Sequence, residues 1–122
     1  MATSPKARTV LEQIHDLIQQ RQYREALHLI DRTGQRSAPM ENARGVCLLR
    51  LGDIDKAGTV FRDLVFTMGS ICPNLDAPVI YCTNYVTAMF LAGNLTSGMG
   101  VLSQIRDRQH PAVQRLQAAL KS

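Results

Sequence analysis

Apolar residues recur every three or four positions along almost the whole chain, which is the period of helices that bury one face. The alternation of apolar and polar residues that is typical of strands is nearly absent. The pattern and its breaks predict seven short helices, the sixth running from about Leu95 to Ile105. The predicted packing residues of the others are Val10, Leu11, Ile14, Leu17 and Ile18; Tyr23, Ala26, Leu27 and Ile30; Met40, Ala43, Cys47, Leu48 and Leu51; Ile54, Ala57, Val60, Phe61, Leu64 and Val65; Ile80, Tyr81, Tyr85, Ala88 and Leu91 or Leu95; and Val113, Leu116, Ala119 and Leu120.

Glycines and capping residues mark the ends of these helices. Gly34, Gly52 and Gly93 are expected to end three of them, because glycine readily adopts the left-handed conformation that follows a helix. The Ser4-Pro5 pair predicts the start of the first helix. Asp76 is the predicted N-cap of the fifth helix.

Three of the predicted turns are followed by the same pattern of residue sizes. The aligned segments are Tyr23-x-x-Ala26-x-x-x-Ile30, Ile54-x-x-Ala57-x-x-x-Phe61 and Leu95-x-x-Gly98-x-x-x-Leu102. Each has a medium apolar residue, a small residue three positions on and a large residue four positions beyond that. A small residue is needed where two antiparallel helices approach closely, so the pattern predicts three helical hairpins.

The central unit carries a longer motif between Gly45 and Phe61. It contains a glycine in the first helix, a turn at Gly52-Asp53, and the small residue Ala57 before the aromatic one. In these features it resembles the tetratricopeptide repeat family. The other two units match less fully, because their turns lie about 31 and 41 residues from the central turn, against 34 in the family, and the family's tryptophan is absent.

The resemblance implies an all-α fold in which antiparallel helical hairpins stack as a short superhelix of about three repeats, closed by a C-terminal capping helix. The length of the chain fits one domain and leaves little room for two. We therefore expect residues 1–122 to form a single domain, with units at roughly 5–34, 38–68 and 77–106 and a cap at 110–121.

The stretch between Asp76 and Arg106 contains no charged residue and is long enough to cross a bilayer. Polar residues and the Gly93-Asn94 turn interrupt it, so we expect the most buried hairpin of the domain and no membrane association. The chain has three cysteines without C-x-x-C spacing and begins without an apolar signal core. Both features suit a reducing compartment, and we expect a cytoplasmic protein.

Candidate chemistry is sparse. The pairs Glu12-x-x-His15 and Glu25-x-x-His28 have the spacing found in di-iron bundles, but no further pair of carboxylates is available, and both glutamates lie opposite the apolar stripes. Cys47 and Cys82 fall in apolar stretches, where a thiol usually behaves as a small buried hydrophobic group. We therefore expect no metal, no cofactor and no catalytic residue, and so no enzyme.

The family resemblance also implies a binding surface, because the first helices of such units line a concave groove for a peptide or a partner helix. Carried over to this chain, the groove positions are Arg8, Glu12, His15, Asn42, Val46, Leu49, Arg50, Thr83, Thr87 and Phe90. Val46, Leu49 and Phe90 are apolar although they lie outside the packing stripes. Either a partner or neighbouring helices bury them.

The charge of the chain leaves two classes of partner open. Its net charge is +4 and its pI about 9.3, with arginine as the main cation, and arginine binds both carboxylates and phosphates. Acidic and basic residues are interspersed, which favours a mixed solvated surface over a nucleic-acid face. We expect a scaffold that binds another protein, with Arg8 and Arg50 pairing with its acids. A nucleic-acid-binding helical repeat is the alternative, and self-association stays open.

Overall fold

The computed structural model describes residues 9–66, 73–74 and 76–121. Within these residues the chain forms seven α-helices and no strand beyond an isolated bridge between Phe66 and Pro73. The expected all-α class is therefore confirmed. The helices are α1 (Val10–Gln19), α2 (Tyr23–Thr33), α3 (Ala38–Arg50), α4 (Ile54–Val65), α5 (Val79–Leu91), α6 (Leu95–Gln104) and α7 (Pro111–Lys121).

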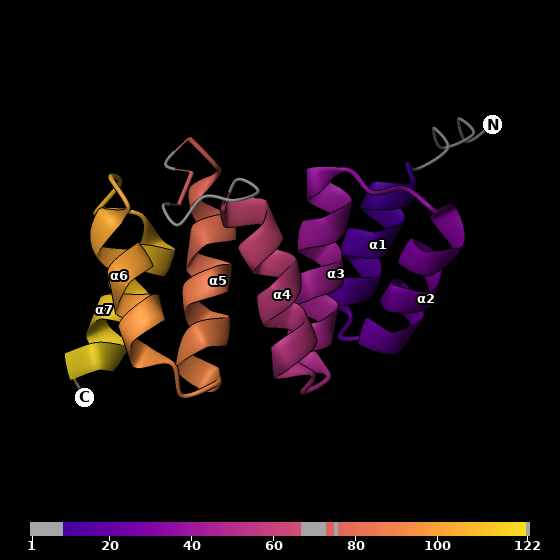
Figure 1. The fold of residues 1–122 in the computed structure, drawn as a ribbon. Helices are drawn as coiled ribbons and strands as arrows, with labels where there is room; N and C mark the ends of the chain where they lie inside the picture. The colour runs from indigo at the N-terminus through magenta and orange to yellow at the C-terminus, as the bar shows by residue number, and fades with distance from the viewer. Residues whose placement is uncertain (1–8, 67–72, 75, 122) are drawn as a thin grey trace.

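The helices follow one another along the molecule, with α1 and α2 at one end and α6 and α7 at the other (Figure 1). Each helix from α1 to α6 packs against the next in sequence. In addition, α1 contacts α3, α3 contacts α5, and α5 contacts α7. The odd-numbered helices therefore form one continuous row, and α2, α4 and α6 are packed against that row.

Two hydrophobic clusters hold the row together. One joins α1, α2 and α3 through residues such as Ile14, Ile30 and Cys47, which are at most 1% exposed. The other joins α4 to α7 and includes Phe61 and Val113, both fully buried. Because α3 also packs Val46, Leu48 and Leu49 against the second cluster, it links the two. Each helix thus depends on its neighbours, as in stacked repeats.

The three turns that align in the sequence have the same backbone geometry. The second residue of each turn is left-handed, with φ of 61° at Arg21, 88° at Gly52 and 82° at Gly93. The next residue donates its amide to a carbonyl five positions earlier, at 2.8, 2.9 and 2.8 Å for Gln22 to Leu17, Asp53 to Leu48 and Asn94 to Met89. The predicted stops at Gly52 and Gly93 are confirmed, and Gly34 ends α2 with φ of 66°.

Small residues lie where the paired helices approach most closely. The repeated small residue is buried in all three hairpins, at Ala26, Ala57 and Gly98. A Cβ atom built on Gly98 would lie 2.5 Å from Cε1 of Phe90, and one on Gly45 would lie 2.5 Å from Cε1 of Phe61. The hairpins α3–α4 and α5–α6 are therefore each closed by a glycine against a phenylalanine ring.

Two predicted helix starts differ from the structure. The Ser4-Pro5 pair lies outside the described residues, and α1 begins after Thr9, whose hydroxyl accepts from the Glu12 amide while the Glu12 carboxylate accepts from the Thr9 amide, both at 3.1 Å. The prediction that Asp76 caps α5 is wrong. Pro78 precedes the helix in an extended conformation, and the residue before a proline is disfavoured in the helical region.

The predicted packing stripes depart from the structure toward the C-terminal end. Among the expected packing residues, Ile80 is 42%, Leu91 60%, Leu95 52% and Leu120 41% exposed, and Ala119 is exposed as well. Because α5 contacts α3, α4, α6 and α7, it buries residues on several sides, and a single stripe does not describe it. Its buried residues are Cys82, Thr83, Tyr85, Val86 and Ala88.

The uncharged stretch between Asp76 and Arg106 holds the α5–α6 hairpin. In the part of the chain that the structure describes, no helix combines the length and apolar character needed to cross a membrane. While α5 is buried on most sides, α6 exposes Leu95 and Met99 to solvent. The lack of charge therefore reflects deep burial for α5 and not for α6.

The glycine–phenylalanine contact can be tested by adding one methyl group. Gly45→Ala should lower the free energy of unfolding by about 1–3 kcal/mol, because the fully buried ring of Phe61 has to shift. In the matched control, Gly100→Ala, the glycine also lies inside a helix but nothing lies within 4 Å of its Cβ position. That control should gain up to about 1 kcal/mol. Urea titrations followed by circular dichroism measure both, and equal effects would contradict the close approach.

The equivalence of the three turns can be tested at Arg21, which occupies the left-handed position that glycine holds in the other two. Arg21→Gly should raise the free energy of unfolding by about 0.5–1 kcal/mol, because the left-handed conformation is strained for any residue with a Cβ atom. Arg24→Gly, inside α2, should lower it by about 1 kcal/mol. A destabilised Arg21→Gly protein in the same urea titration would show that the first turn is not equivalent.

Candidate functional site

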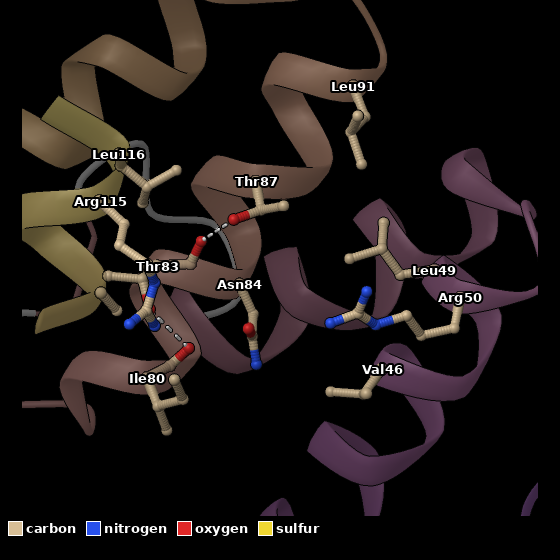
Figure 2. Close-up of a pocket in the computed structure, with 11 residues that line it drawn as sticks. Val46, Leu49, Arg50, Ile80, Thr83, Asn84, Thr87, Leu91, Arg115 and Leu116 are labelled. Atoms are coloured by element: carbon tan, nitrogen blue, oxygen red, sulfur yellow. Dashed lines mark hydrogen bonds between the residues drawn. The ribbon is translucent and has the colours of Figure 1, made fainter. Parts of the chain in front are cut away.

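A groove with a volume of about 350 Å³ lies on the row of odd-numbered helices, and we call it the central groove (Figure 2). Three helices far apart in the sequence form it. It is lined by Val46, Leu49 and Arg50 of α3, by Ile80, Thr83, Asn84, Thr87 and Leu91 of α5, and by Ala112, Arg115 and Leu116 of α7. Since α5 contacts both α3 and α7, it forms the floor, and the other two helices form the walls.

Polar groups of the floor are partly engaged within the protein. The Thr83 hydroxyl donates to the Ile80 carbonyl at 3.1 Å, and the Thr87 hydroxyl donates to the Thr83 carbonyl at 2.8 Å. The Asn84 side-chain amide donates to Oδ1 of Asn42 at 2.9 Å, which ties α5 to α3. The threonines therefore offer only acceptor lone pairs to an incoming molecule, whereas Asn84 keeps one N–H group.

The walls carry the charge of the groove. Arg50 and Arg115 are the charged residues among the described side chains that line it, and both are exposed. Neither forms an ion pair within the described residues, whereas Arg36 and Arg44 pair with Glu41 at 2.9 and 3.3 Å. Figure 2 shows both guanidinium groups reaching toward α5 from opposite walls. The groove is therefore a cationic site with apolar side chains beside the charges.

The structure brings five of the sequence-predicted groove residues together in the lining of the central groove: Val46, Leu49, Arg50, Thr83 and Thr87. Asn42 lies beside the groove, hydrogen-bonded to Asn84 of the floor. All of these residues come from the second and third predicted units. In both units, the helix periodicity was enough to indicate which side of the first helix faces away from its partner in the hairpin.

The remaining predicted groove residues do not join this set. Phe90 is half-buried and its ring lies against Gly98, because the missing side chain of that glycine leaves room for the ring between α5 and α6. His15 is exposed on α1 and does not line the groove, and Glu12 caps α1. Arg8 lies outside the described residues. The central groove thus spans α3, α5 and α7 and excludes the first unit.

Several lining residues were not predicted as groove residues. Ile80 and Leu91 were assigned to the packing stripe of α5, and Asn84 was not singled out. All of the α7 contribution, including Arg115, was missed because α7 was expected to act only as a cap. The signal that could have revealed it is positional, because the seventh helix follows three hairpins and so continues the row of first helices.

Catalytic and metal-binding chemistry finds little support in the described residues. No group of three or more His, Cys, Asp and Glu side chains comes together there. Burial raises the pKa of the Cys47 thiol to about 11, although nearby Arg44 partly opposes the shift, and burial also raises the pKa of Cys82. A raised pKa keeps a thiol protonated at neutral pH, which makes both cysteines poor nucleophiles.

No protein-family model matches the chain, and no curated protein or solved structure matches it. Its function is therefore inferred from the residues of the central groove and from the chemistry of their side chains. The groove is where α3, α5 and α7 bring apolar, hydroxyl and cationic groups to one surface.

Proposed function

We propose that the chain is a non-enzymatic module that binds another protein, with a peptide or a partner helix seated in the central groove. The observation that supports this most directly is the convergence of α3, α5 and α7 on one hollow surface. Apolar side chains in the centre and polar or charged groups at the edge are the usual anatomy of a protein-binding surface. The groove has both kinds of group.

The apolar side chains of the groove support a protein partner because they are unusually open to solvent. Leu91 is 60% and Ile80 42% exposed, and Leu49 lines the same hollow from the opposite helix. Clustered exposed apolar groups on a folded domain commonly mark an interaction surface. A partner helix or peptide that placed one apolar side chain between these residues would remove them from water.

We also propose that the helices form a tetratricopeptide-like stack. Three features support this arrangement: the shared geometry of the three turns, the small residue buried at the same place in each hairpin, and the contacts that link the odd-numbered helices in a row. In such a stack the groove for a partner lies on the row of first helices. In this arrangement α7 acts as the first helix of a further unit as well as covering the end of the stack.

The proposal is tested with peptides selected from a displayed random library on the immobilised chain. Leu91→Glu should weaken the binding of the selected peptides by about tenfold or more, because a carboxylate would replace an apolar anchor. Met99→Glu is the matched control, since Met99 is 48% exposed on α6 and lies outside the groove lining. Fluorescence anisotropy measures affinity, and circular dichroism checks that both variants stay folded.

Two results would contradict the proposal. One is that the library yields no peptide that binds the folded chain. The other is that the selected peptides bind the Leu91→Glu and Met99→Glu variants equally well, which would place the interaction surface elsewhere.

A further inference from the structure

The two arginines of the central groove stand on opposite walls with the α5 floor between them (Figure 2). Arg50 ends α3, and Arg115 lies in α7, so helices distant in the sequence position the two charges. No acidic side chain is among the described residues of the lining, and neither guanidinium has an ion-pair partner in the described chain. The pair therefore presents uncompensated positive charge to whatever enters the groove.

Hydrogen-bond donors available in the groove are mainly these two guanidinium groups. The hydroxyl hydrogens of Thr83 and Thr87 are used on α5 carbonyls, and one N–H of Asn84 is used on Asn42. What remains is ten guanidinium N–H groups at most and a single amide N–H. A ligand rich in acceptors and negative charge is therefore matched, whereas a cationic ligand would meet repulsion.

From this geometry we infer that the groove is selective for an acidic protein segment, whose Asp or Glu carboxylates pair with Arg50 and Arg115 while an apolar side chain between them packs on Leu49 and Leu91. This inference rests on the proposed function and adds the chemistry of the partner to it. Arginine suits this role because its planar fork binds a carboxylate through two parallel hydrogen bonds.

The lining favours an acidic peptide over a nucleic acid. Single-stranded nucleic acids are held by aromatic side chains that stack on the bases, and none of the described lining residues is aromatic. Two cations also neutralise few phosphates, whereas nucleic-acid surfaces use many. In contrast, the apolar contribution of Val46, Leu49, Leu91 and Leu116 has a clear use for a peptide with apolar side chains.

The test compares two double variants that remove the same amount of positive charge. One carries Arg50→Glu and Arg115→Glu in the groove, and the other carries Arg24→Glu and Arg32→Glu, which are exposed on α2 outside it. The probes are a fluorescent peptide selected on the unaltered chain, the same peptide with its Asp and Glu changed to Asn and Gln, and a single-stranded RNA homopolymer. Affinity is measured by anisotropy over a series of salt concentrations.

We expect the selected peptides to be enriched in Asp and Glu. The groove double variant should bind them at least about tenfold more weakly, because like charges then face each other. The α2 double variant should bind nearly as tightly as the unaltered chain. The amide peptide should also bind at least about tenfold more weakly than the acidic one, and the difference should shrink as salt is raised.

Other outcomes overturn the inference in distinguishable ways. Peptides that require Leu91 but are not enriched in Asp and Glu, or that bind the groove double variant at unaltered affinity, would refute the acidic partner and leave the proposed function standing. Peptides that do not require Leu91 would refute both. RNA that binds more tightly than the peptides and depends on Arg50 and Arg115 would replace the acidic segment with a nucleic acid.

Discussion

Within the hairpins α3–α4 and α5–α6, a glycine of one helix lies against a phenylalanine ring of the other, where no Cβ atom would fit. This contact sets how closely the paired helices approach, and it fixes the rotation of each helix about its axis. On α5, the ring of Phe90 is directed to Gly98 of α6, while Thr87 and Leu91 are left on the groove side. The identity of the groove residues thus follows from a packing requirement on another face of the same helix.

The row of odd-numbered helices follows from the same local rule applied three times. Each hairpin closes through a turn of one geometry, and each first helix then meets the next first helix. No helix contacts every other one, so the fold is built from neighbouring contacts, and its groove needs three consecutive members of the row. Removing α7 would take away Arg115 and Leu116 and leave the groove with one wall.

Much of this architecture was predictable because it depends on short-range patterns. The repeated small residues and the glycine stops identified the turns, and helix periodicity placed five groove residues correctly on one surface. Features that depend on how many neighbours a helix has were not predictable in this way. α5 has four contacting helices, so Ile80 and Leu91, which looked like core residues, are exposed in the groove, whereas Phe90 packs against α6. The Thr9–Glu12 capping box was visible in the sequence and was overlooked.

The most direct test of the central claim is to map a bound peptide on the isotopically labelled chain by NMR. If the central groove is the binding surface, the amide signals that shift on titration with a selected peptide will belong to α3, α5 and α7, with Leu49, Leu91 and Arg115 among them. Shifts confined to α2, α4 and α6 would contradict the account, because they would place the partner on the opposite side of the stack.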